Sequence, residues 1–213
     1  MAEGRLDGRV ERGNRTRRLI LERAARIASV EGLESLSLGR LATELELSKS
    51  GVFTLFGSKR ELQLATVRAA AAVYREHVVR PALEEPPGLG RVWRLCAGWL
   101  EYSERRVFPG GCFFGSVTPE FDAREGEVHD ALAAARRDWV GFVEDTLGEA
   151  AGAGALRAET DTGQLAFEIV ALLEAANAES VLHGTTGCYG RAATGIRNRL
   201  AQVAAPGAEL PGD

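Results

Sequence analysis

Residues 37–62 decide the fold of this chain, and they read SLGRLATELELSKSGVFTLFGSKREL. Leu38, Leu41, Ala42 and Leu45 recur at helical spacing, which predicts a first short helix with one apolar face. A serine stands before this helix and before each of the two that follow, where its hydroxyl can accept from unpaired backbone N–H groups, at positions 37, 48 and 58. Two such helices joined by a tight turn have the shape that places the second helix in a DNA major groove.

The predicted second helix covers residues 48–56, and Gly57 ends it. Val52, Phe53 and Phe56 give it an apolar side. We interpret Phe53 as a packing residue rather than a stacking one, because a duplex offers no unstacked base.

The stretch from Ser48 to Leu62, SKSGVFTLFGSKREL, resembles the helix-turn-helix of TetR-family transcriptional regulators. The resemblance covers roughly residues 15–65, and its upstream frame consists of Ala24, Ala25, Ile27, Glu31-Gly32, Ser37, Leu41 and Ala42. A later stretch is similar to one branch of that family, through Pro109-Gly-Gly-Cys-Phe-Phe114 and Glu120-Phe-Asp122. The family resemblance implies a DNA-binding head and a larger helical domain that binds an effector and forms a dimer.

Three positions depart from the family pattern. Glu46 occupies the turn position where glycine is usual, so the turn must differ slightly or carry strain. Phe53 replaces a frequent phosphate-binding tyrosine and therefore lacks that hydroxyl contact, and Leu55 replaces a histidine or another polar residue.

Charge is unevenly divided along the 213 residues. The whole chain carries a net charge of −4, yet residues 1–60 hold 12 Lys/Arg against 8 Asp/Glu. A basic head on an acidic body suits a protein whose first domain meets a polyanion. No apolar run reaches the roughly 20 residues of a membrane span, and the three cysteines form no disulfide framework, so we expect a cytoplasmic protein without a membrane segment.

The pattern predicts an all-α fold with four parts. Residues 1–14 read as a flexible basic arm that either touches DNA or forms a disordered tail, and 15–60 read as a three-helix DNA-binding domain. Residues 61–205 read as the effector-binding and dimerisation domain, and 206–213 as a disordered tail. Within the larger domain we expect helices over 59–80, 89–106, 126–149, 162–183 and 189–204, and Pro81 with the Glu-Glu-Pro-Pro-Gly run at 84–88 ends the first of them. The irregular segment at 107–125 is unusually apolar for a loop, so we expect it to fold over the core or to line a cavity.

The polar residues of the predicted reading helix and of nearby helix starts are the candidate DNA contacts. Lys49 and Lys59 are assigned to phosphate, Arg40 to the DNA backbone, and Thr54 to a phosphate or a thymine methyl group. Gly51 allows close approach to DNA. The full predicted set is Ser37, Arg40, Lys49, Ser50, Gly51, Thr54 and Lys59. An ordinary solvated helix face is the alternative.

The resemblance also implies a homodimer interface and an effector site in the larger domain. The apolar stripes of the last two helices are the candidate interface, with an intramolecular core as the alternative: Leu165, Ile169, Leu172, Ala176, Ile196 and Leu200. The candidate lining of an effector site, each member of which could equally be plain core, is Trp93, Cys96, Trp99, Phe113, Phe114, Phe121, Trp139 and Asn177.

Other chemistry has weaker support. Cys112 follows a glycine pair and could sense oxidation, although a buried structural thiol fits it better. Glu125 and His129 have the i, i+4 spacing of a metal pair but no third ligand, so no metal and no cofactor is expected. A small helical enzyme using these residues would leave the helix-turn-helix unexplained. The sequence therefore predicts a homodimeric transcriptional regulator that binds double-stranded operator DNA as a repressor and leaves it when a small molecule binds.

Overall fold

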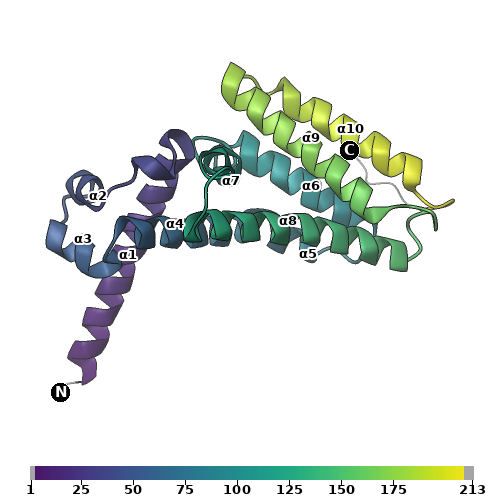
Figure 1. Ribbon diagram of the computed structural model, residues 1–213. Coiled ribbons are helices and arrows are strands. Elements are labelled where there is room, and N and C mark those ends of the chain that lie inside the picture. The colour runs from purple at the N-terminus through teal and green to yellow at the C-terminus, as the bar shows by residue number, and fades with distance from the viewer. Residues whose placement is uncertain (1–2, 209–213) are drawn as a thin grey trace. The chain divides into compact units, whose positions relative to one another are not determined.

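The computed structural model describes residues 3–208, with side chains from residue 11 onward, and these residues are helical apart from turns and two isolated β-bridges. Figure 1 shows the helices in chain order. The chain divides into two compact units, Met1–Ala71 with Phe108–Leu132, and Ala72–Val107 with Ala133–Asp213. The predicted all-α fold is confirmed. The division differs from the predicted boundary at residue 60, because a segment from the middle of the chain joins the first unit.

The first unit contains the predicted helix-turn-helix. Its helices are α1 (Glu3–Glu31), α2 (Leu38–Glu44), α3 (Lys49–Phe56) and the start of α4 (Lys59–Tyr74). All three predicted serine caps are present, since Ser37, Ser48 and Ser58 each accept a backbone N–H at 3.1 Å. Arg17 of α1 donates to the Leu55 carbonyl oxygen at 2.9 Å, which attaches the end of α3 to α1.

The N-terminal segment is more regular than the sequence suggested. Helix α1 begins at Glu3, so residues 3–14 are helical rather than an irregular arm, and residues 1 and 2 lie outside the described residues. The three glycines of this segment each cost a helix about 1 kcal/mol relative to alanine, but no proline interrupts it and most of its other residues favour helices. At the other end, only residues 206–208 of the predicted tail are described, and they form a turn.

The turn between α2 and α3 keeps a left-handed residue although it lacks glycine. Glu46 has φ of 54°, so it adopts the conformation that glycine adopts most easily. The expected strain therefore resides in Glu46 itself, at about 1–2 kcal/mol for a left-handed residue with a Cβ atom.

Pro81 itself does not end the fourth helix, whereas the predicted run at 84–88 does, since it follows directly after the last helical residue, Leu83. Helix α4 passes into a π-helical turn at Arg75–Val79 and then into α5 (Arg80–Leu83), which contains the proline. A proline lacks its own N–H and clashes with the carbonyl of an earlier turn, and the wider π turn just before it relieves that conflict.

The segment predicted as irregular contains two short helices. These are α7 (Phe113–Val117) and the 3₁₀ turn η3 (Thr118–Glu120), and Phe108, Phe113 and Phe121 around them are buried. The prediction that this apolar segment would be buried is correct, while its backbone is more regular than expected.

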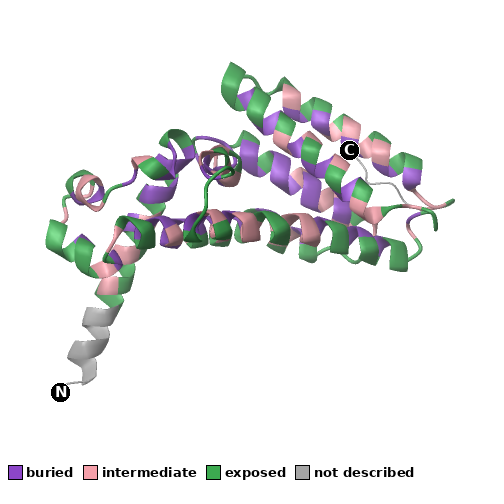
Figure 2. Cartoon of the chain, in the orientation of Figure 1, coloured by how far each residue is buried: buried purple, intermediate pink, exposed green. Residues whose placement is uncertain are grey.

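The second unit is a helical layer formed by α6 (Leu89–Glu104), most of α8 (Glu127–Gly152), α9 (Thr162–His183) and α10 (Gly187–Val203). Helices α9 and α10 lie side by side along their length, and α6 packs against both. Figure 2 shows that the facing sides of these helices are buried and their outer sides exposed. No helix between residues 3 and 208 is long and apolar enough to cross a membrane.

Candidate DNA-binding site and effector domain

Helix α3 has one side fixed in the core and one side open to solvent. Val52 and Phe56 are buried. The predicted groove-facing residues of this helix, Lys49, Ser50, Gly51 and Thr54, are all exposed. Their exposure agrees with the predicted reading face.

Two of these residues have local roles that the sequence did not reveal. The Thr54 hydroxyl donates to the Ser50 carbonyl oxygen at 2.8 Å. A Cβ atom at Gly51 would lie 2.8 Å from the Ser48 hydroxyl, which caps the helix. Glycine at this position therefore protects the cap, in addition to any role in close approach to DNA.

Phe53 is 59% exposed, so the prediction that it packs in the core is wrong. The apolar side of α3 is complete without it, because Val52 and Phe56 already occupy the buried positions. Spacing alone could not separate the three, since Val52 and Phe53 lie four and three residues before Phe56 and both spacings share a helix face.

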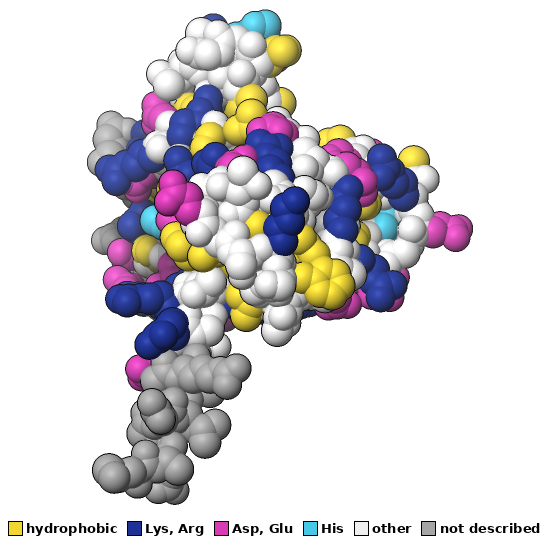
Figure 3. Space-filling model, turned by 90° about the vertical axis from the view of Figure 1, so that its left-hand side faces the viewer, with side chains coloured by type: hydrophobic (Ala, Val, Ile, Leu, Met, Phe, Trp, Pro, Cys, Tyr) yellow, Lys and Arg dark blue, Asp and Glu magenta, His cyan; other side chains and the backbone are white. Residues whose placement is uncertain are grey.

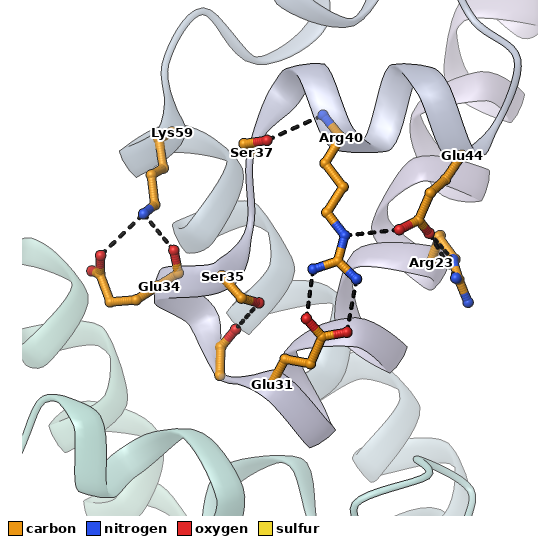
Figure 4. Close-up of polar contacts among 9 residues, drawn as sticks. Arg23, Glu31, Glu34, Ser35, Ser37, Arg40, Glu44 and Lys59 are labelled. Carbon is orange, nitrogen blue, oxygen red and sulfur yellow. Dashed lines mark hydrogen bonds and ion pairs between the residues drawn. The ribbon is translucent and has the colours of Figure 1, made fainter.

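Arg40 is held by two carboxylates in the free chain (Figure 4). Its guanidinium donates to both oxygens of Glu31 at 2.6 and 2.7 Å and to Glu44 at 2.8 Å. Glu44 also accepts from Arg23 at 2.7 Å. These hydrogen bonds lower the pKa of Glu31 and of Glu44, chiefly through Arg40, and Glu31 and Glu44 together raise the pKa of Arg40.

Lys59 is also occupied. Its ammonium donates to the Glu34 carbonyl oxygen at 2.6 Å and to the Glu34 carboxylate at 3.0 Å (Figure 4). This hydrogen bond is the largest cause of the lowered pKa of Glu34, and Arg124 lies 3.5 Å from the same carboxylate. A phosphate that binds Lys59 or Arg40 must therefore replace a glutamate, whereas Lys49 forms no ion pair with any of the described residues.

Glu120 ties the mid-chain segment to the helix-turn-helix. Its two carboxylate oxygens accept the backbone N–H groups of Leu33 at 2.9 Å and Glu34 at 3.1 Å, which caps the 3₁₀ turn η1 (Leu33–Ser35). Gly32 has φ of 85°, and any side chain on it would overlap the Glu120 carboxylate. A second tie is the Gly110 N–H, which donates to the Ser29 hydroxyl at 3.2 Å. In the sequence analysis Glu120 appears only within the stretch that resembles one branch of the family, and no role was predicted for it.

The predicted effector residues fall into both units. Phe113, Phe114 and Phe121 belong to the first unit, where Phe113 contacts Phe108 and Phe114 with ring centroids 5.6 and 5.3 Å apart. The others belong to the second unit: Trp93, Cys96, Trp99, Trp139 and Asn177.

The second-unit members have separate surroundings. Trp139 packs edge-on against Tyr74, with ring centroids 5.2 Å apart, and Tyr74 packs edge-on against Tyr102. Trp93 is covered by the guanidinium of Arg197, 4.3 Å from the ring centroid. Trp99 and Cys96 are buried in the core.

Asn177 belongs to a buried polar network that the sequence did not predict. The Ser103 hydroxyl donates to the Asn177 side-chain oxygen at 2.7 Å and lies 2.8 Å from the Tyr189 hydroxyl. Arg106 donates to Tyr189 at 2.9 Å and to Ser180 at 2.7 Å, and no carboxylate of the described residues pairs with it. Arg106 has φ of 51°, a left-handed conformation that costs a residue with a side chain and that marks functional sites more often than others.

The cysteines and the Glu125/His129 pair show no reactive arrangement. Cys96 and Cys112 are buried, no disulfide joins the three cysteines, and burial raises the pKa of Cys96 to about 12. His129 contacts Asp130 at 3.0 Å instead of Glu125. Between residues 3 and 208 no three His, Cys, Asp or Glu side chains form a metal-binding group.

The predicted dimer residues are mostly core of one chain, which corrects their assignment. Five of the six are buried within the chain itself, so their side chains cannot meet a partner: Leu165, Ile169, Ala176, Ile196 and Leu200. Only Leu172 is partly exposed. A different stripe of α9 is open and apolar, with positions three or four apart: Phe167, Ala171, Ala175, Ala178 and Leu182.

Two family profiles match the chain. Residues 20–66 match the family described as bacterial regulatory proteins, tetR family, and residues 88–196 match the tetracyclin repressor-like C-terminal domain. This chain belongs to the TetR family. TetR-family proteins are DNA-binding transcription factors, so the protein is a transcriptional regulator and not an enzyme.

Solved TetR-type structures share the fold over nearly the whole chain. A TetR transcriptional regulator from Chloroflexus aurantiacus is 23% identical, with 91% of this chain and 98% of that one covered and a TM-score of 0.84. A putative transcriptional regulator from Saccharomonospora viridis, solved in complex with choline, is 21% identical over 90% and 98%, with a TM-score of 0.75. AibR, solved with isovaleryl coenzyme A and operator DNA, is 18% identical over 88% and 97%, with a TM-score of 0.66. No curated protein matches the chain.

Proposed function

We propose that this TetR-family regulator is a cytoplasmic, homodimeric repressor that leaves a palindromic operator when a small molecule binds its second unit. The observation that carries the proposal is helix α3, which is capped by Ser48, anchored by Val52 and Phe56, and open on its polar side. A mobility-shift assay with the DNA upstream of the chain's own gene tests it, and failure to shift that DNA at low salt would count against it.

The proposed DNA contacts fall into two kinds. Lys49, Lys59 and Arg40 bind phosphate, the last two after exchanging a glutamate for it, while Ser37 marks the helix start where N–H groups favour a phosphate. Ser50, Gly51 and Thr54 face the groove. Substitutions at the lysines should weaken operator and random DNA alike, and substitutions at Thr54 should change preference among operators.

The dimer is proposed to form through the open stripe of α9. Phe167 and Leu182 are 66% and 76% exposed, which leaves two large apolar side chains in water unless a second copy covers them. Two recognition helices per dimer would also match two half-sites of a palindrome.

The test is the double variant Phe167→Glu with Leu182→Glu, measured by light scattering. Leu83→Glu is the matched control, because Leu83 is 51% exposed in the same unit but lies on α5. We expect monomers from the double variant and dimers from the control. Folded dimers from both would refute the interface.

The effector is proposed to bind beside the network of Ser103, Asn177 and Tyr189 in the second unit. Support comes from Arg106, whose hydrogen-bond partners are all uncharged and whose backbone is strained. The ligand can release DNA only if it binds the two states of the dimer with different affinity. Native mass spectrometry of freshly purified protein tests this, with Arg106→Gln expected to lose a co-purified ligand that Arg136→Gln, on the exposed side of α8, retains.

A further inference from the structure

Helix α3 carries almost none of the side chains that read bases through hydrogen bonds. Bidentate contacts to guanine come from Arg or Lys, those to adenine from Asn or Gln, and carboxylates accept from cytosine. The sequence of α3, KSGVFTLF, contains no Arg, Asn, Gln, Asp or Glu. Its single cation, Lys49, is the residue already assigned to phosphate.

The hydroxyl groups of α3 do not fill this gap. Thr54 donates its proton to the Ser50 carbonyl oxygen at 2.8 Å, so in this rotamer its hydroxyl has no proton left for a base. The side chain still offers a methyl group. Ser50 alone keeps an uncommitted hydroxyl on the exposed side.

What α3 does present is an aromatic ring. Phe53 is 59% exposed and lies four residues after Lys49 on the same side of the helix, next to Thr54. Figure 3 looks at this end of the molecule and shows hydrophobic side chains beside Lys and Arg side chains. The ring has no hydroxyl and therefore cannot donate to a phosphate.

The major-groove edges of the four base pairs carry a single apolar group, the C5-methyl of thymine. We propose that Phe53, with the Thr54 methyl beside it, reads thymine methyl groups, so that this regulator selects its operator half-site by methyl contacts more than by base hydrogen bonds. The inference rests on α3 being the reading helix. It assigns to Phe53 a role in sequence specificity. A contact that only positions the protein would instead affect binding to every DNA sequence equally.

The experiment starts with duplexes that the full-length protein selects from a random pool. In the selected sequence each thymine is replaced in turn by uracil, which removes only the methyl group. Loss of one buried methyl should weaken binding about fourfold at a contacted position, as expected from the transfer free energy of one carbon group. Exchange of that T·A pair for C·G should weaken binding further, and exchange for 5-methylcytosine·G should restore part of the loss.

Protein variants then locate the contact. Phe53→Ala should bring the ratio of thymine to uracil affinity close to one at the positions that the ring contacts, and its thermal unfolding should stay unchanged because the ring is exposed. Lys59→Ala is the matched control, since it should weaken both duplexes and keep their ratio.

Two results would overturn the proposal. One is a selected duplex whose uracil versions all bind as tightly as the parent. The other is a thymine-to-uracil ratio that survives Phe53→Ala. Selection of no sequence at all would refute specific DNA binding itself, so the two failures are distinguishable.

Discussion

Replacing Glu34 by glutamine tests whether Lys59 must leave a carboxylate before it can bind phosphate. The two side chains are 44% and 48% exposed and 3.0 Å apart, so their ion pair is a surface pair. Such pairs contribute about 0.2–1 kcal/mol. If Lys59 exchanges Glu34 for a phosphate, as proposed, Glu34→Gln should tighten binding by about 1.4- to fivefold.

The dependence on salt separates Lys59 from its partner. Each phosphate neutralised adds about −0.9 to the slope of log K against log salt, so Lys59→Ala should flatten that slope by about 0.9. Glu34→Gln should leave the slope near its parent value, because the lysine still reaches its phosphate. Fluorescence anisotropy on operator and scrambled duplexes, between about 50 and 200 mM salt, measures both quantities.

A matched control removes the same charge elsewhere in the first unit. Glu125 is exposed and forms no ion pair with any of the described residues, so Glu125→Gln changes the net charge without affecting the Lys59–Glu34 pair. Equal tightening by both substitutions would mean that net charge, and not release of the lysine, explains the effect. An unchanged slope in Lys59→Ala would refute the phosphate contact itself.

Three further outcomes follow from the same structure. Glu46→Gly should raise the unfolding free energy by about 0.5–1 kcal/mol in urea titrations, because the relief of left-handed strain exceeds the entropy gained by the unfolded chain. Peroxide should leave DNA affinity unchanged in the parent and in Cys112→Ser, since that thiol is buried. Glu31 and Glu44 have a lowered pKa when folded, so the stability they add is complete above their ordinary value of 4.5 and is lost as pH falls through the folded pKa. Arg40→Gln should reduce the loss of unfolding free energy between pH 6 and pH 3 in denaturation curves. An unchanged loss would show that Arg40 is not its cause.

The helix-turn-helix could be predicted because its signals are local. A serine cap acts within three residues, and Ser37, Ser48 and Ser58 all make the expected hydrogen bond. The departure at Glu46 was visible for the same reason, because the dihedral angles of a turn depend on a few adjacent residues; the structure shows strain at Glu46 as the outcome of the two alternatives.

The same patterns could not predict which surface covers each apolar helix face. Periodicity marks an apolar face but does not say whether the chain's own helices or a second copy covers it. Ile169 and Leu200 therefore looked like interface residues, although α6, α9 and α10 bury them within one chain. Arg106 and Glu120 were missed because their contacts join residues more than 70 positions apart.

Because Phe108–Leu132 belongs to the first unit, the DNA-binding end of this protein is assembled from two pieces of the growing chain. The ribosome adds about 5–20 residues per second, so the second piece follows Ala71 after about 3–12 s of synthesis. During that interval the nascent chain already holds every proposed DNA contact but not the Glu120 carboxylate that caps Leu33–Ser35. A chain cut after Ala71 would remain at this stage, so the helix-turn-helix is expected to be less stable alone than in the full-length protein.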